Sequence, residues 1–164
     1  TLNASGAASY INNENGKTLC FGSEYSFYAC RDITVKALST AASTASADVI
    51  ATPVLDNGKV YIVGSFALPA GCTIQSFGIV FDALASKPDN LSLADVSKDN
   101  YIFNLSASKY TCGGQRGNQF TVSFNQNSGD YPVGNYVAYA IYTDANGNTQ
   151  YAYSDVIKNA NLVG

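Results

Sequence analysis

The sequence predicts an all-β fold, in which an antiparallel β-sandwich follows a smaller β-hairpin unit. Short runs of alternating apolar and polar residues recur at close, regular spacing, and turn residues separate them. No segment shows a convincing helical period of apolar residues. The dipeptide Asn-Gly, the strongest short signal for a β-hairpin turn, occurs three times. Together these patterns are typical of two packed antiparallel sheets.

The first 38 residues predict a partial β unit. The segment NENGKT at Asn13–Thr18 is a hairpin signal, and alternation over Tyr25–Ala29 and Ile33–Ala37 predicts two further strands. The next segment, STAASTASA, consists of small residues without periodicity, which indicates a linker. We therefore expect a partial β unit at residues 1–38, a linker at 39–47 and a sandwich at 48–164.

Within the sandwich the runs IATPVL, KVYIVGSFAL, TIQSFGIVFDA, YIFNLSASKY and QFTVSFN predict successive strands. The polar segment at Ser86–Asn100 predicts a long loop with a single helical turn. The glycine-rich segment CGGQRGN, residues 112–118, predicts a second loop that turns the chain.

The last predicted hairpin, YVAYAIYTDANGNTQYAYS, is apolar on both faces. A two-residue turn at Asn146-Gly147 places Tyr142 opposite Tyr151 and Ala140 opposite Tyr153. The side chains of Val137, Tyr139 and Ile141 then lie on the other face. Because an ordinary antiparallel sheet buries one face and exposes the other, this hairpin needs a cover on both.

The composition argues against several classes of function. Charged residues make up 13% of the chain, the net charge is -3 and the nine basic residues are scattered, so we expect no nucleic-acid binding. No apolar run reaches the length of a membrane-spanning helix, so we expect no membrane insertion. The chain contains no histidine, and no paired carboxylates are placed across a cleft. We therefore expect no enzyme activity, cofactor or metal site.

Four cysteines can pair in three ways, and an oxidising compartment favours disulfides over a zinc site. The pairing that we favour joins Cys20 to Cys30 and Cys72 to Cys112.

Two segments, GKVYIVGSFALPAGCTIQSFGIVFD and GNYVAYAIYTDANGNTQYAYSDV, carry a family resemblance. They resemble fibronectin type III-like (immunoglobulin-like) sandwich modules of secreted multidomain surface proteins of anaerobic Gram-positive bacteria, over about residues 48–158. The segment NENGKTLCFGSEYSFYACRDITVKAL resembles the closing strands of a small β repeat in the same proteins. The resemblance implies a secreted or cell-surface location.

By analogy with type III modules, the resemblance implies that Tyr136 is a tyrosine corner and that Ala138, Ala140 and Tyr142 point into the sandwich. We expect the strands before the linker to cover the opposite face, which carries Val137, Tyr139 and Ile141. Any part of that face left uncovered is expected to be an interaction surface.

The expected function is that of a non-catalytic extracellular module in adhesion, spacing or presentation. Its expected partners are other domains of the same surface protein, neighbouring copies, a glycan or a host protein. One alternative is a carbohydrate-binding module of a glycan-degrading system, and another is a filament subunit that assembles by strand addition.

The candidate binding residues are Val137, Tyr139 and Ile141 on the sheet, and Gln115 and Arg116 in the glycine-rich loop. For a glycan, Tyr139 and the loop at residues 112–119 are the favoured places. Tyrosines with rings that could stack on a sugar are Tyr10, Tyr25, Tyr101, Tyr110, Tyr131, Tyr139, Tyr151 and Tyr153.

Overall fold

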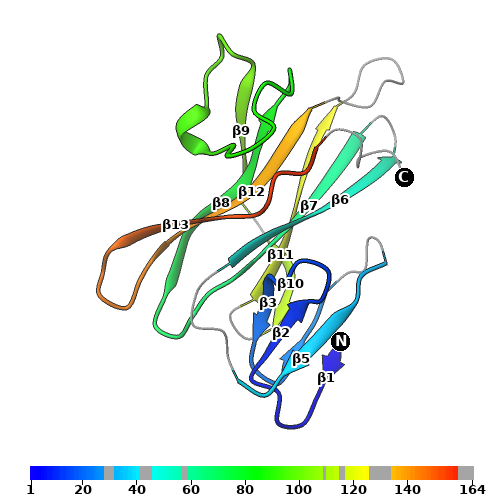
Figure 1. The fold of residues 1–164 in the computed structure, drawn as a ribbon, viewed down its shortest axis with the longest axis vertical. Helices are drawn as coiled ribbons and strands as arrows, with labels where there is room; N and C mark the ends of the chain where they lie inside the picture. The colour runs from blue at the N-terminus through cyan, green and yellow to red at the C-terminus, as the bar shows by residue number, and fades with distance from the viewer. Residues whose placement is uncertain are drawn as a thin grey trace.

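Two four-stranded antiparallel sheets form the main body of the molecule in a computed structural model (Figure 1). The structure describes residues 1–27, 32–40, 46–56, 59–108, 110–114, 117–125 and 134–158. One sheet has the strand order β10-β11-β7-β6, with bounds Tyr110–Gly114, Gly117–Asn125, Lys59–Ala67 and Ser46–Asp56. The other has the order β13-β12-β8-β9, with bounds Thr149–Tyr153, Asn135–Thr143, Thr73–Asp82 and Ile102–Ala107. The predicted all-β antiparallel fold is confirmed.

The hydrophobic core lies between these two sheets. Because side chains alternate along a strand, one face of each sheet supplies it. Its largest members from β7, β8 and β11 are three phenylalanines, with Phe77 5.2 Å from Phe66 and 5.1 Å from Phe120 between ring centroids. Strand β12 adds Tyr136, whose ring stacks on Phe81 at 4.7 Å. The tyrosine is fully buried, and burial raises the pKa of its hydroxyl.

Strand β12 of the last hairpin is buried on both faces over Tyr136–Ala140, as predicted, although β13 is more exposed. The side chains of Tyr136, Ala138 and Ala140 belong to the core between the sheets, and Tyr142 packs against it. The alternate residues Val137 and Tyr139 belong to a second apolar cluster on the opposite face of the same sheet. Strand β12 is therefore covered on both sides.

The predicted register of this hairpin is wrong by one residue. Tyr139 lies opposite Tyr153, Ala140 opposite Ala152 and Ile141 opposite Tyr151. The cause is Asp144, whose Oδ1 accepts hydrogen bonds from the backbone N–H groups of Asn146 and Asn148, each at 2.9 Å. These bonds lengthen the turn beyond two residues. As a result Tyr151 and Tyr153 share a face with Tyr139.

The amino-terminal residues form two smaller sheets. Strands β1 (Leu2–Asn3) and β4 (Glu24–Tyr25) pair with each other, while β3 (Thr18–Phe21), β2 (Ser9–Asn12) and β5 (Val35–Leu38) form a three-stranded sheet. Their apolar cluster is centred on Tyr10, Leu19 and Tyr25. The β2–β3 hairpin lies at the predicted NENGKT turn.

This unit covers a different sheet from the predicted one. All four residues of β3 are buried, and the strand contacts β6, β7 and β11, which belong to the sheet without β12 (Figure 1). On the outer face of that sheet, opposite the core residues Ile62 and Phe66, Ser65 is buried at 1% exposure. The expectation that residues 1–38 shelter Val137, Tyr139 and Ile141 is therefore wrong.

Two predicted loops have different outcomes. Residues 83–101 join β8 to β9 and contain a single 3-10 turn, η1 (Leu93–Asp95), as predicted for Ser86–Asn100. The glycine-rich segment turns the chain as predicted, but most of it belongs to paired strands and not to a loop, because β10 extends to Gly114 and β11 begins at Gly117. The Asn57-Gly58 turn lies outside the described residues, and the division of the chain at the linker stays a prediction.

The described residues contain neither of the predicted disulfides. Cys72 is a free thiol, so no bond joins it to Cys112. Cys20 is a buried thiol whose Sγ donates to the carbonyl oxygens of Phe21 at 3.2 Å and Glu24 at 3.5 Å. Cys30 and the side chain of Cys112 lie outside the described residues. Cys20 therefore acts as a small buried side chain.

Candidate functional site

The loop at residues 83–101, here called the cover loop, supplies the second cover of strand β12. The cover loop contributes Leu91, which is 2% exposed, and Leu93 to the apolar cluster that holds Val137 and Tyr139. Val156, in the segment after β13, packs against the same cluster. The outer face of this sheet is therefore sheltered by the chain's own loop.

Asp82, the last residue of β8, anchors the start of the cover loop. Its fully buried carboxylate accepts hydrogen bonds from the backbone N–H groups of Leu84 at 3.2 Å and Lys87 at 2.6 Å. The hydroxyl of Ser86 donates to the same carboxylate at 3.2 Å. From the start of β12, Asn135 Nδ2 donates to the carbonyl oxygen of Lys87 at 3.0 Å. These bonds fix the path of residues 83–87.

Substituting Asp82→Asn is expected to lower the free energy of unfolding by about 1.5–3 kcal/mol, because buried bonds to a charged acceptor are lost. Denaturant unfolding measures the change. Asp89→Asn, in the exposed ion pair with Lys158, is the matched control and is expected to cost about 0–1 kcal/mol. An Asp82→Asn protein as stable as this control contradicts the anchoring role.

Asp95 fixes the second half of the cover loop. Its carboxylate accepts hydrogen bonds from the backbone N–H and the hydroxyl of Ser92, both at 3.0 Å, and forms an ion pair with Lys87 Nζ at 2.9 Å. The hydrogen bond with Lys87 and the bonds with Ser92 lower the pKa of Asp95, against an opposing effect of burial. The lysine thus ties η1 back to the start of the loop.

The lowered pKa of Asp95 predicts a pH dependence of stability. A carboxylate with a folded-state pKa below its unfolded value stabilises the fold above about pH 4, and this contribution is lost as the pH falls through the folded pKa. The stability difference between the natural chain and Asp95→Asn should therefore be constant above about pH 5 and shrink in acid. Urea unfolding across this pH range measures it, and a difference that grows on acidification contradicts the assignment.

The cover loop also carries unusual backbone conformations. Ala85, Asn90 and Tyr101 have φ angles of 51°, 61° and 55°, and they are the non-glycine residues with positive φ in the described part of the chain. This left-handed region is disfavoured for residues with a Cβ, although asparagine tolerates it better than most. Strained residues persist where the surrounding contacts hold them, and such residues are enriched at functional sites.

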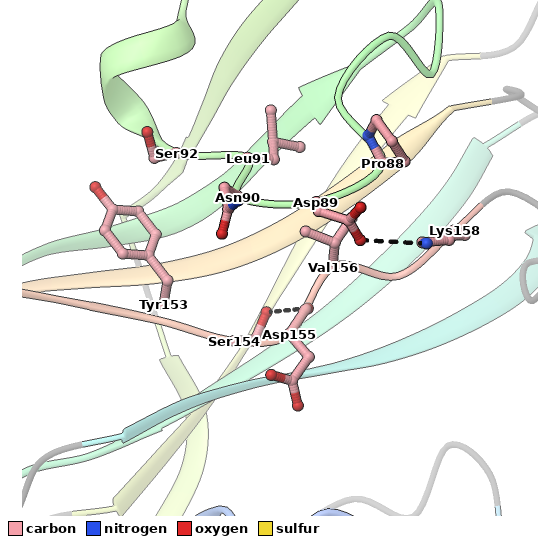
Figure 2. A pocket seen from close by; sticks show the side chains of 10 residues that line it. All are labelled: Pro88, Asp89, Asn90, Leu91, Ser92, Tyr153, Ser154, Asp155, Val156 and Lys158. Atoms are coloured by element: carbon pink, nitrogen blue, oxygen red, sulfur yellow. Dashed lines mark hydrogen bonds and ion pairs between the residues drawn. The ribbon is translucent and has the colours of Figure 1, made fainter.

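A groove of about 540 Å³ runs between the cover loop and the segment after β13 (Figure 2). The strand ladder changes at Ser154. Its backbone N–H still donates to the carbonyl oxygen of Ala138 at 3.0 Å, but its hydroxyl accepts from the backbone N–H of Ala138 and donates to the carbonyl oxygen of Asp155, both at 2.9 Å. The chain returns to β12 at Ile157, which pairs with Tyr136. The lining residues are Pro88, Asp89, Asn90, Leu91, Ser92, Tyr153, Ser154, Asp155, Val156 and Lys158.

The charged groups around the groove are paired. Across it, Lys158 Nζ lies 3.3 Å from Asp89 Oδ1 (Figure 2). Lys17, from the β2–β3 turn, lies 3.5 Å from Asp155 Oδ1. The groove therefore presents both carboxylates and ammonium groups, and neither charge dominates its electrostatic potential.

Tyr153 forms an aromatic wall of the groove (Figure 2). Partial burial raises the pKa of its hydroxyl, and a hydrogen bond with the backbone of Leu93 opposes this effect. Two residues earlier on the same face, the side chain of Tyr151 is 58% exposed.

Three of the sequence-predicted binding residues, Val137, Tyr139 and Ile141, lie away from the groove. Val137 and Tyr139 are 1% and 2% exposed, so they belong to the interior, and Ile141 is partly buried beside them. The hydroxyl of Tyr139 donates to Asn104 Oδ1 at 2.9 Å, and burial raises its pKa. Gln115 and Arg116 lie outside the described residues. Val137, Tyr139 and Ile141 do not line the groove.

Sequence reasoning includes Tyr151 and Tyr153 among many tyrosines but does not single out Asn90 or Lys158. The available signal is the Pro-Asp-Asn run at residues 88–90, which favours a turn with a left-handed asparagine. The pairing of this turn with residues 153–158 depends on the fold.

A scan against protein-family models, a search of curated proteins and a search of solved structures found no match to this chain. Within the described residues there is no group of three or more His, Cys, Asp or Glu side chains that could hold a metal ion. The described segments contain no helix of the length and apolarity that a membrane crossing requires.

Proposed function

We propose that this chain is a non-catalytic recognition module of an adhesive or presenting surface protein, secreted or held at the cell surface. The observation that carries the proposal is the groove beside the cover loop, because a loop fixed to a rigid sheet is a common way to build a binding site.

The proposed sandwich type is immunoglobulin-like, in the fibronectin type III sense. Successive strand pairs alternate between the two sheets, so that β6, β7, β11 and β10 lie in one and β8, β9, β12 and β13 in the other. This order corresponds to the A, B, E and D strands facing the C, C′, F and G strands of that class. The buried Tyr136 at the start of β12 fits the tyrosine-corner position.

Of the other roles considered, filament assembly by strand addition loses part of its basis. The filament hypothesis assumes that the strands of residues 1–38 do not pack against other strands of the same chain. The residues of β3 are buried, and this strand contacts β6, β7 and β11 of the same chain.

The test is a binding panel with the immobilised full chain, in which extracellular-matrix proteins, mucin and polysaccharides are the probes and biolayer interferometry is the readout. We expect saturable binding to at least one probe, and we expect it to weaken in Asn90→Gly, which removes an exposed side chain of the groove without demanding a new backbone conformation. Absence of saturable binding, or binding that the substitution leaves unchanged, contradicts the proposal.

A further inference from the structure

We infer that the groove binds a neutral polysaccharide chain, an inference that rests on the proposed recognition function. Its size is within the range of sites for small ligands and ligand segments, and it is built from an aromatic wall, a fixed loop and exposed polar side chains. Each of these three features selects for sugar chemistry.

The aromatic wall offers rings to the apolar faces of sugars. Tyr153 lines the groove, and Tyr151 projects from the same face of β13 two residues away, a separation of about 7 Å along a strand. The exposed ring of Tyr151 therefore extends the aromatic surface beyond the groove itself. Aromatic rings with a polar end suit ligands that are apolar on their faces and polar at their edges.

The charges around the groove favour an uncharged ligand. Asp89 is paired with Lys158, Asp155 with Lys17 and, within the cover loop, Asp95 with Lys87. An anionic polysaccharide would meet carboxylates and no excess of cations, and a basic peptide would meet the lysines. Hydroxyl groups can donate to carboxylates and accept from ammonium groups, so a neutral sugar can use both signs.

The backbone on either side of Asn90 is fixed before a ligand arrives. Asn90 lies between two anchored points of the loop. Asp82 binds the backbone before it, at Lys87, and Asp95 binds the backbone after it, at Ser92. Groups that are already in position lose little entropy on binding. In such a site most of the conformational entropy lost on binding is that of the flexible sugar chain, and little is that of the protein backbone.

The strand geometry disfavours an extended peptide as the occupant. A peptide added to the edge of the sheet would need a continuous run of backbone hydrogen-bonding groups. Strand β13 has only five residues, and its ladder changes at Ser154, where the groove begins. Recognition in the groove must therefore rely on side chains.

The test uses the full chain and two groups of polymers. The neutral probes are β-glucan, arabinoxylan and galactomannan, and the anionic probes are polygalacturonate and heparin. Affinity gel electrophoresis gives the ranking, and calorimetry with oligosaccharides of the strongest polymer gives the Kd. We expect one neutral polymer to bind in preference to the anionic ones.

Two variants and one control locate the site. Tyr151→Ala and Asn90→Gly are each expected to weaken binding of the neutral polymer about tenfold, which corresponds to about 1.4 kcal/mol. Tyr101→Gly removes a ring of similar exposure, 55%, that directly precedes β9, at the edge of the sheet opposite β13. Its backbone has a positive φ that glycine accepts. This control should bind like the natural chain.

The outcomes separate the inference from the proposed function. Preference for an anionic polymer, or weakening by Tyr101→Gly equal to that by Tyr151→Ala, overturns the inference. Binding of a matrix protein that Asn90→Gly weakens, without binding of any neutral polymer, overturns the inference and supports the recognition function. Failure of every polymer and every protein to bind overturns both.

Discussion

Replacing Tyr139 with alanine is expected to lower the free energy of unfolding by about 3–5 kcal/mol, because a large buried ring leaves a cavity that its neighbours fill only in part. The ring lies between the sheet and the cover loop at 2% exposure. It has room there because its partner across the ladder is Gly78, where an added Cβ would lie 3.0 Å from the tyrosine Oη. Thermal and urea unfolding measure the loss.

Two controls separate burial from hydrogen bonding. Tyr139→Phe keeps the ring but loses the bond to Asn104, and is expected to cost about 0.5–1.5 kcal/mol. Tyr151→Ala, on the same face but exposed, should cost within about 0.5 kcal/mol. If Tyr139→Ala proves as mild as Tyr151→Ala, the second apolar cluster does not exist in solution.

Replacing Gly64 with valine is expected to destabilise the core between the sheets by about 1–3 kcal/mol or more, because it overpacks a filled space. A Cβ at Gly64 would lie 2.7 Å from Cε2 of Phe120. That ring is fully buried, with Phe77 at 5.1 Å and Phe66 at 6.3 Å between centroids, so it cannot move aside. Denaturant unfolding gives the loss.

The double variant Gly64→Val with Phe120→Ala tests whether overpacking against the Phe120 ring causes the loss of stability. Phe120→Ala alone is expected to cost about 3–5 kcal/mol. In the pair, the valine methyl groups occupy part of the space that the ring vacates, so the combined loss should be smaller than the sum by about 0.5–3 kcal/mol. Losses that add within about 0.5 kcal/mol would show that the two positions do not contact each other.

Alternation and turn chemistry predict most of the sheet structure. The residues of β12 are apolar at every position from Val137 to Ile141, and this pattern by itself requires a cover on both faces of the strand. Alternation and turn dipeptides do not predict the register of the last hairpin, because the side chain of Asp144 determines the length of its turn. Asp144 binds the turn backbone, and a turn assigned from Asn-Gly alone omits this competitor.

The identity of the second cover cannot be inferred from the sequence. The segment at Ser86–Asn100 is polar on average, and of its few apolar residues Leu91 and Leu93 are the ones that pack over the apolar face. Two leucines in a polar loop are a weak signal. By sequence the early strands are the better candidate because they are apolar and incomplete, but they cover the other sheet.

The groove cannot be predicted from the sequence either, although the local structure of the loop that lines it can be. Asp82 ends a strand and precedes Ser86 and Lys87, an arrangement that favours local capping. The groove forms because that capped loop passes beside residues 153–158, and this contact depends on the tertiary fold.

The central claim is that the cover loop, and not the amino-terminal unit, shelters the outer face of strand β12. Nuclear Overhauser contacts of the Leu91 methyl groups in the full chain test it most directly. The structure predicts contacts from these methyl groups to side chains of the cluster that contains Val137 and Tyr139. Contacts from Val137 and Tyr139 to residues 1–38, with none to Leu91, would contradict the account.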